Sequence, residues 1–494
     1  MRMITRRQPH PNAGRRVLSV LLTLTASAAA LAVPGPASAT PAGAPAPTGS
    51  IRWGTCPASD PLPAPGPQVQ CGTLRVPVDW SQPDGPTTDI FVARHRATDP
   101  GRRVGVLMTN PGGPGAPGAD SAMYADDPYS GYSASLRERF DIVGFDPRGI
   151  GRSNSVTCDE SIRESIPARP RDAAGFNRLR TLNGRLADSC LERSGPLAAH
   201  MDGETVARDM DAIRAALGER TISFIGHSYG TFLGERYARL FPENLRALAL
   251  DSAMDPERPD AERYLTDGSV AVEGALRKVA AWCAQDASCV LKGEDVLALT
   301  SRLFDRAEAG TLHEPGPTGP TRRKLTADQL SGILTAVLRG WSPQVSTEQL
   351  AALHTGKGEV HLWPGRSDSV VQLVLCRDND FRIRDHAEYR AIMGRVAKAA
   401  PHVRYNAQAL DMVLGCQGWS MPPKPRPAQA SGDLPPALVA NARYDQATPL
   451  PGARRMARAF PGARLHVSET VGHWLYTQDD VKQVLDSFLL SPGS

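Results

Sequence analysis

The chain has 494 residues, of which 41% are hydrophobic, 22% charged and 6% aromatic. These proportions are ordinary for a folded globular protein and exclude a disordered, a collagen-like and a multi-span membrane protein. The formal charge is +4, from 56 Lys and Arg against 52 Asp and Glu, so nucleic acid and anionic membranes have to be considered as partners.

An export signal accounts for this positive charge. The first 39 residues contain five arginines and no Asp, Glu or Lys, and they continue through an apolar run at 17–33 to Ala37-Ser38-Ala39. This order predicts a signal peptide cleaved after Ala39 and hence a secreted, extracellular protein. The run is shorter than the roughly 20 residues that a membrane span needs, and it stops at Pro34. Arg15-Arg16 leaves both the general and the twin-arginine export routes open.

The mature chain is close to neutral. Without the five signal arginines it has 51 basic and 52 acidic residues, a net charge of −1. We therefore expect no nucleic-acid partner. No cysteine lies near the cleavage site, so we also expect no lipid or other membrane anchor. Residues 40–50 are rich in Pro and Ala, as in a flexible lead-in or a trimmed pro-segment.

Eight cysteines lie in the mature part, and an even number in an oxidising compartment predicts four disulfides. Eight cysteines allow 105 connectivities. Pairing in chain order closes short loops within single structural regions, and we expect it here: Cys56–Cys71, Cys158–Cys190, Cys283–Cys289 and Cys376–Cys416.

Strand and helix patterns alternate along the first and last parts of the mature chain. Apolar or β-rich segments predict strands, and helical spacing of apolar residues predicts helices. Because the strands are almost wholly apolar, the pattern favours an α/β fold whose mostly parallel sheet is covered on both faces. The predicted strands are 74–78, 89–94, 104–109, 140–145, 221–225, 245–250, 437–440 and 463–467, and the predicted helices are 207–217, 229–241 and 479–490.

Residues 257–432 have a different sequence pattern, without the alternation of strands and helices. They are mostly helical in pattern, contain four of the cysteines and are broken by Pro- and Gly-rich stretches such as 313–320. We interpret them as a cap inserted into the α/β core. The core then has a first part at 51–256 and a second at 433–494.

The motif Gly226-His-Ser-Tyr-Gly230 joins a predicted strand to a predicted helix. This is the nucleophile elbow of α/β-hydrolases, in which a sharp turn presents a serine hydroxyl at a helix N-terminus. The flanking residues must be small because the chain approaches itself closely there. The motif predicts the α/β-hydrolase fold with Ser228 as nucleophile.

A serine nucleophile needs a general base and a carboxylate that orients it, and in this fold the chain order is Ser, acid, His. Only His466 and His473 follow the cap. His466 falls inside a predicted strand, where a structural role is expected. His473 lies in a glycine-containing loop before the last helix, so we predict it as the base. Asp445 follows the strand that begins at 437 and is the predicted acid.

The oxyanion hole is expected from two backbone amides: that of Tyr229, after the nucleophile, and one in the loop Asn110-Pro-Gly-Gly-Pro-Gly115. Gly113 is the predicted second donor, with Gly112 as the alternative. The same loop matches a dinucleotide fingerprint, Gly113-x-Gly115-x-x-Gly118. Its prolines remove amides that a pyrophosphate would need, and no metal motif is present, so we expect no cofactor and no metal.

Taken together, these motifs resemble the secreted tripeptidyl aminopeptidases, which are α/β-hydrolase serine peptidases related to proline iminopeptidases. The resemblance extends from Cys56 to the last helix and includes Asp-Pro-Arg-Gly at 146–149, Cys-x-Asp at 376–378 and Cys-x-x-Trp at 416–419. It implies release of short peptides, often tripeptides, from the free N-termini of peptides or proteins. It also implies the triad Ser228, Asp445 and His473, and a buried structural pair of Asp146 with Arg148.

Two departures from the family pattern bear on the substrate. Trp474 replaces a common glycine after the histidine and is expected to narrow the leaving-group side. Residues 442–444 lack the usual glycine turn. An aminopeptidase needs an acid for the α-ammonium group, and Asp378 and Asp380 are candidates. A carboxylesterase with the same triad is the alternative function, and a catalytically silent binding protein is the third reading; the oligomeric state stays open.

Overall fold

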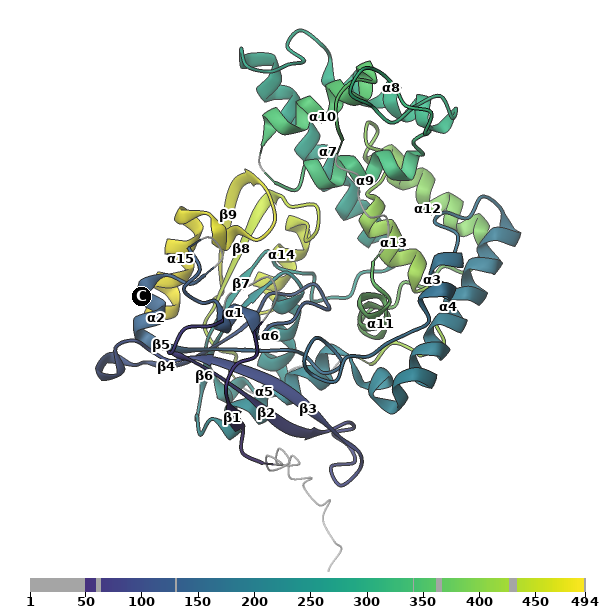
Figure 1. Ribbon diagram of the computed structural model, residues 1–494. Coiled ribbons are helices and arrows are strands. Elements are labelled where there is room, and N and C mark those ends of the chain that lie inside the picture. Colours follow the sequence, from purple (N-terminus) through teal and green to yellow (C-terminus); the bar gives the residue numbers. More distant parts are fainter. Residues whose placement is uncertain are drawn as a thin grey trace, which may run out of the picture. The chain divides into compact units, whose positions relative to one another are not determined.

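Nine strands pair into one sheet, in the order β1-β2-β3-β5-β4-β6-β7-β8-β9 (Figure 1). The strands from β5 to β9 are parallel to one another, and β1, β2 and β3 add an antiparallel edge. The predicted mostly parallel sheet is confirmed. The strands are β1 (Arg52–Gly54), β2 (Val69–Pro77), β3 (Thr87–His95), β4 (Gly105–Asn110), β5 (Phe140–Phe145), β6 (Ile222–His227), β7 (Leu245–Asp251), β8 (Ala437–Tyr444) and β9 (Arg464–Val471).

The computed structural model describes residues 49–58, 64–128, 131–340, 342–360, 367–425 and 433–492. The expected export signal, its cleavage site after Ala39 and most of the Pro- and Ala-rich lead-in lie outside these ranges. Within them, no helix is long and apolar enough to cross a membrane.

The centre of the sheet is buried on both sides. Every residue of β4, β5 and β6 is buried, which explains their nearly continuous apolar sequences. Successive side chains of β4 point to opposite faces, so Val106 and Met108 pack into one hydrophobic cluster while Leu107 packs into another. Both faces of the sheet have to be covered because apolar side chains of these strands point to each of them.

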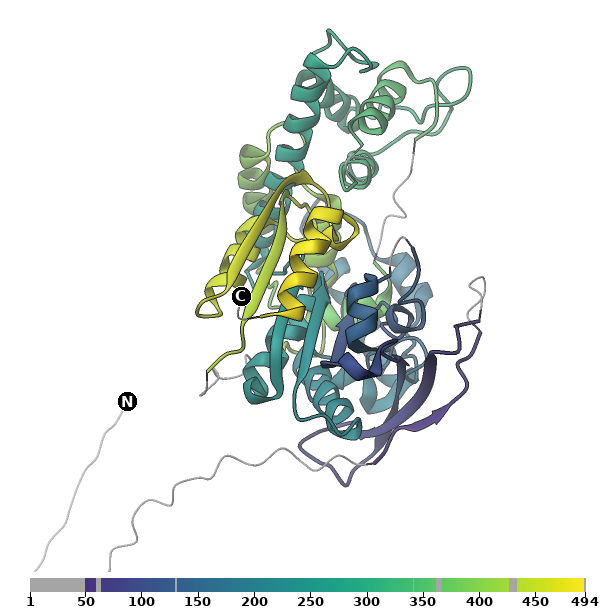
Figure 2. The same cartoon turned by 90° about the vertical axis from the view of Figure 1, so that its left-hand side faces the viewer.

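Two groups of helices supply this cover (Figure 2). Helices α1 (Asp120–Met123), α2 (Ala134–Arg139) and α15 (Asp479–Leu490) contribute Met123, Leu136 and Leu485 to the cluster that contains Leu107. Helices α5 (Gly203–Ala216), α6 (Tyr229–Leu240) and α14 (Leu450–Arg458) pack into the cluster on the other face. Helices α3 (Glu160–Ser165) and α4 (Ala173–Ser194) follow β5 in the chain.

Between β7 and β8 the described chain is mainly helical, drawn from teal to light green in Figure 1. Short polar side chains begin most of these helices: Asp260, Asp295 and Asn406 each accept a backbone N–H of the first turn, and Thr326 forms a capping box with Gln329. The helices are α7 (Ala261–Gln285), α8 (Val296–Glu308), α9 (Ala327–Val337), α10 (Pro343–Thr355), α11 (Ser369–Asp378), α12 (His386–Ala399) and α13 (Ala407–Gly415).

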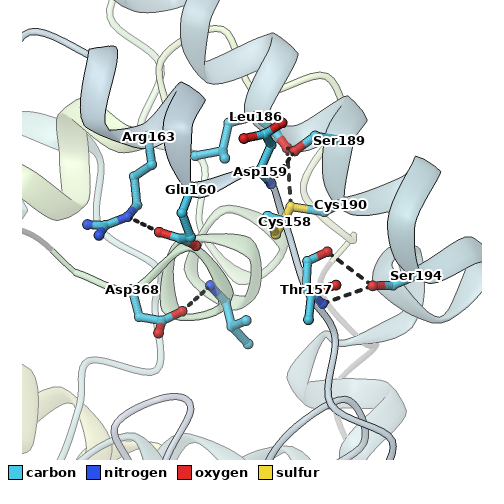
Figure 3. Close-up of a disulfide and its surroundings, with 11 residues drawn as sticks. Thr157, Cys158, Asp159, Glu160, Arg163, Leu186, Ser189, Cys190, Ser194 and Asp368 are labelled. Atoms are coloured by element: carbon cyan, nitrogen blue, oxygen red, sulfur yellow. Dashed lines mark hydrogen bonds and ion pairs between the residues drawn. A yellow bond between two sulfur atoms is a disulfide. The ribbon is translucent and has the colours of Figure 1, made fainter.

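The four disulfides have the predicted chain-order pairing: Cys56–Cys71, Cys158–Cys190, Cys283–Cys289 and Cys376–Cys416. Figure 3 shows how Cys158–Cys190 joins the segment before α3 to α4. On either side of the bond, the Thr157 N–H donates to Ser194 Oγ and the Asp159 N–H donates to Ser189 Oγ, both at 2.9 Å. The bond and these contacts together hold the two segments side by side.

Candidate active site

Ser228 occupies the turn between β6 and α6. Its backbone has φ 56° and ψ −123°, a conformation that residues with a side chain rarely adopt. The chain approaches itself closely on both sides of this turn. A Cβ added to Gly226 would lie 2.4 Å from the Gly230 carbonyl oxygen, and one added to Gly230 would lie 2.3 Å from that of Asn110. The glycines of the motif are therefore required by packing, and the hydroxyl sits at the N-terminus of α6.

His473 and Asp445 come together from the ends of β9 and β8. The His473 Nδ1 atom lies 2.8 Å from Asp445 Oδ2 and 3.1 Å from Oδ1. The buried Asp445 carboxylate also accepts the N–H groups of Ala447 and Thr448, each at 2.9 Å, and the Thr448 hydroxyl at 2.7 Å. Since a carboxylate only accepts, Nδ1 carries the proton and Nε2 is left as the basic nitrogen.

A pocket brings Ser228 together with the loop that carries Gly113. It encloses about 560 Å³ of space between atoms, part of it open to solvent. Thr448 also lines it and contacts His473 Nδ1 at 3.3 Å, so the pocket borders the acid–base pair. Within the described part of the chain, no hydrogen bond joins Ser228 to His473. The lining residues are Gly113, Pro114, Ser228, Met254, Tyr264, Gly268, Arg339, Leu375, Asn406, Gln408, Ala409, Met412, Gln446, Ala447, Thr448 and Pro449.

The structure distinguishes the two candidate oxyanion donors in the 110–115 loop. The Gly112 N–H donates to Asn110 Oδ1 at 2.9 Å, and a Cβ on Gly112 would lie 2.8 Å from the Tyr229 nitrogen. Gly112 thus supports the turn, but its N–H is already used. Gly113 lines the pocket beside Ser228, and no acceptor for its N–H occurs among the described residues. This favours the Gly113 amide, with that of Tyr229, as the donor pair.

A second buried carboxylate holds the histidine loop. Asp251, at the end of β7, accepts the N–H of Leu475 at 3.1 Å and that of Tyr476 at 3.0 Å. Its Oδ2 atom also lies 2.9 Å from His227 Nδ1. Next to it, the Ser252 hydroxyl accepts the N–H of Trp474 at 2.8 Å. Three consecutive amides after His473 are therefore fixed to the end of β7, which sets the position of the His473 ring.

The predicted role of Trp474 has no support from the pocket. Trp474 is absent from the lining residues, and its ring packs on His227, with the ring centroids 5.5 Å apart. The side chain that follows the histidine therefore contributes to anchoring the loop.

Neither candidate acid for the α-ammonium group lines the pocket. Asp378 is fully buried and accepts the Tyr229 hydroxyl at 2.6 Å and the Gly203 N–H at 2.9 Å. It therefore links α11 to the first residue of α6. Asp380 is 41% exposed and is paired with Arg382. Burial, together with the nearby carboxylate of Asp202, raises the pKa of Asp378 to about 6.

This raised pKa predicts a pH-dependent stability. The folded state binds the Asp378 proton more tightly than the unfolded state, so the free energy of unfolding should fall by roughly 3 kcal/mol as the pH rises from about 4 to about 6. Above that range the loss is complete. Asp378→Asn should remove this fall, as measured by urea unfolding at a series of pH values. Asp380→Asn, which removes an exposed carboxylate nearby, should retain it; an unchanged fall in Asp378→Asn contradicts the prediction.

Asp146 and Arg148 are buried structural residues, as predicted, but they do not pair with each other. Both side chains are fully buried, but Arg148 donates to the carboxylate of Asp209 on α5 at 2.6 and 2.7 Å and to the carbonyl oxygens of Pro77 and Val78. Asp146 instead accepts the N–H groups of Ala119 and Arg152. Arg148 braces β2 against α5, and Asp146 holds the end of the 110–118 loop.

Sequence reasoning missed three contributors to the site. Thr448 has no motif of its own. Asp251 had a signal, because an acidic residue at the carboxyl end of a predicted parallel strand lies at the edge where the other site residues gather. Arg339, the one charged residue that lines the pocket within the described chain, follows α9 in a segment without any recognisable pattern.

The sheet, the serine turn and the acid–base pair are those of an α/β-hydrolase, and comparison with known proteins agrees. The model of the alpha/beta hydrolase fold family matches residues 105–480, so the chain belongs to this family. It is a serine hydrolase, as the sequence predicted.

Curated relatives place it among serine peptidases of this family. The chain is 30% identical to the tripeptidyl aminopeptidase of Streptomyces coelicolor over 481 residues, which cover 91% of this chain and 85% of the relative. It is 29% identical to the serine protease Hip1 of Mycobacterium tuberculosis over 448 residues, 84% of each chain. Carboxylesterase B of M. tuberculosis is 30% identical over 443 residues, 82% of this chain and 80% of the relative.

Proposed function

We propose that this protein is a secreted serine exopeptidase that releases short peptides, chiefly tripeptides, from free N-termini. The observation that carries the proposal is the His473–Asp445 pair, which leaves Nε2 as the basic nitrogen and which contacts Thr448, a residue of the pocket that Ser228 also lines. The tripeptide specificity rests on similarity to the tripeptidyl aminopeptidase. Secretion rests on the N-terminal signal and on the four disulfides, which persist in oxidising compartments.

In the proposed reaction, the Ser228 hydroxyl attacks the scissile carbonyl carbon and His473 Nε2 takes the hydroxyl proton. The Asp445 carboxylate stabilises the resulting imidazolium. The amides of Gly113 and Tyr229 stabilise the oxyanion, assisted by the N-terminal dipole of α6. His473 then protonates the leaving amine, and water hydrolyses the acyl-enzyme with the same histidine as base. Ser228 and His473 are not hydrogen-bonded in this substrate-free structure, so substrate binding has to bring them into contact. Catalytic hydrogen bonds are often long without substrate and shorten when it binds.

In this proposal the helical region 257–432 is a cap that restricts what reaches Ser228. Supporting this role, half of the residues that line the pocket come from this region, among them Tyr264, Gly268, Asn406 and Met412. The core parts 51–256 and 433–494 provide the nucleophile and the acid–base pair, respectively. An exopeptidase needs such a restriction because an open cleft would admit internal peptide bonds.

A carboxylesterase is the second candidate, and one observation favours it. No acidic side chain lines the pocket within the described part of the chain, whereas an aminopeptidase has to bind an α-ammonium group. The relative named carboxylesterase B is consistent with this alternative. The same triad serves either reaction because fold and triad do not select amides over esters.

A panel of chromogenic substrates tests the proposal. Tripeptidyl p-nitroanilides with a free N-terminus should be hydrolysed with the highest kcat/KM. Single-residue anilides and N-acetylated tripeptidyl anilides should be at least about tenfold poorer, because each lacks an interaction of the bound N-terminus. Turnover of p-nitrophenyl esters alone would overturn the peptidase assignment in favour of an esterase. Equal rates with free and acetylated N-termini would overturn the exopeptidase assignment.

A further inference from the structure

Arg339 differs from every other residue that lines the Ser228 pocket. Among the lining residues, the others are apolar, amide-bearing or hydroxyl-bearing, so Arg339 alone gives the pocket a formal charge. It is only partly buried. No carboxylate lies within ion-pair distance of it in the described part of the chain. Since Arg339 lines the pocket and its charge has no partner among the described residues, it is available to a ligand.

The position of Arg339 relative to the histidine loop indicates which part of a substrate it faces. A Cβ added to Gly472 would lie 3.7 Å from the Arg339 carbonyl oxygen, so the two segments are neighbours. Gly472 directly precedes His473. In a serine hydrolase the histidine protonates the leaving group, so the leaving group lies on the histidine side of the scissile bond. Arg339 thus borders the leaving-group side of the pocket.

We propose that Arg339 selects substrates whose leaving group carries a carboxylate. A guanidinium presents several N–H donors in a planar fork that matches a carboxylate, and among the described residues no acidic side chain lines the pocket to compete for it. For a peptide this carboxylate is either the C-terminal group of a single leaving residue or the side chain of Asp or Glu. The inference builds on the proposed function, but it holds for an ester leaving group as well.

Two matched substrate pairs test this selectivity. The first pair is 3-carboxy-4-nitrophenyl acetate against 4-nitrophenyl acetate, with each rate divided by its uncatalysed rate. The second is Ala-Ala-Ala-Ala as the free acid against its C-terminal amide, and Ala-Ala-Ala-Asp-amide separates a side-chain carboxylate from a terminal one. In each pair the wild type should favour the carboxylate by about tenfold in kcat/KM, the size expected of one charge-assisted contact open to solvent.

Charge variants at position 339 should change these ratios in order. Arg339→Gln should bring the ratio close to one, and Arg339→Glu should reverse it, because an acid there repels the carboxylate. The matched control is Arg302→Gln, which removes the same charge from an exposed position on α8 and should keep the wild-type ratio. Thermal unfolding of each variant checks that the fold is retained.

The outcomes separate this inference from the proposed function. If the ester pair responds to Arg339 but no peptide is hydrolysed, the selectivity of Arg339 stands and the peptidase assignment fails. If peptides are hydrolysed but wild type and Arg339→Gln have the same ratios in both pairs, the Arg339 inference is overturned and the peptidase assignment stands. A response of only one tetrapeptide arm identifies which carboxylate is bound.

Discussion

Replacing Ser228 by alanine should lower kcat/KM by about 10⁴- to 10⁶-fold for tripeptidyl anilides and for p-nitrophenyl esters alike. The reason is that the substitution removes the only atom that forms the acyl-enzyme in the proposed reaction. The pocket, the oxyanion amides and the His473–Asp445 pair remain, so a small residual rate above water is expected. Stopped and continuous assays of the two substrate types measure the loss.

The control for this variant is Ser165→Ala, at the exposed end of α3, which should keep the wild-type rate. The variant Ser228→Ala should also retain wild-type urea unfolding, because its hydroxyl makes no hydrogen bond that the fold needs among the described residues. A rate within tenfold of the wild type for either substrate would show that another group is the nucleophile.

The backbone at Ser228 adds a second, independent readout. With φ at 56° the turn is strained for any residue that has a Cβ, and glycine relieves such strain. Ser228→Gly should therefore be as inactive as Ser228→Ala but more stable by roughly 1 kcal/mol in urea unfolding. Equal stability of the two variants would mean that the turn stores no strain.

These expectations rest on features that the sequence carries locally. Short apolar runs in the sequence predict the buried parallel strands, and Gly226-His-Ser-Tyr-Gly230 predicts both the turn and the strand and helix on either side of it. Chain order then leaves few candidates for the acid and the base, and the structure brings Asp445 and His473 into contact. The disulfides were predictable because each one closes a loop of 6 to 40 residues within one region.

Side-chain partners across the fold were not predictable in this way. Arg148 lies two residues from Asp146, but β2 and α5 converge on it, so its guanidinium pairs with Asp209, 61 residues away. Asp378 reads in sequence as one of two nearby surface acids, Asp378 and Asp380. The fold buries the first, which accepts the Tyr229 hydroxyl and the Gly203 N–H, and leaves the second partly exposed and paired with Arg382. Such outcomes depend on how elements meet, which no local pattern encodes.

The largest expected effect on stability concerns Asp251, whose carboxylate anchors the loop that carries the proposed catalytic base His473. Replacing it by alanine leaves the buried amides of Leu475 and Tyr476 without an acceptor and removes the partner of His227. The free energy of unfolding should fall by roughly 3–5 kcal/mol. The histidine loop also loses its anchor on β7, so kcat should fall by about 10- to 100-fold in the folded fraction.

Asp251→Asn is the milder variant because it keeps the size and one acceptor oxygen, so it should lose less stability than Asp251→Ala. In Asp251→Asn the side-chain NH2 group would face a backbone N–H or His227. Since two donors cannot form a hydrogen bond, this contact would displace the loop. The matched control is Asp480→Asn, an exposed carboxylate at the start of α15, for which we expect wild-type stability and rate. Urea unfolding and ester kinetics on the same preparations separate the two effects.

A double variant decides whether Asp251 acts on the reaction through His473. If the carboxylate only positions the base, Asp251→Asn has nothing to position once His473 is replaced by alanine. The double variant should then be no slower than His473→Ala alone, although its stability should still fall. If the rate losses multiply, Asp251 affects the reaction by another route, such as the Ser228 turn, whose N–H donates to the Asp251 carbonyl oxygen at 3.0 Å. We expect the double variant to be no slower than His473→Ala. The substitution changes the Asp251 carboxylate, which accepts the N–H groups of Leu475 and Tyr476 in the histidine loop.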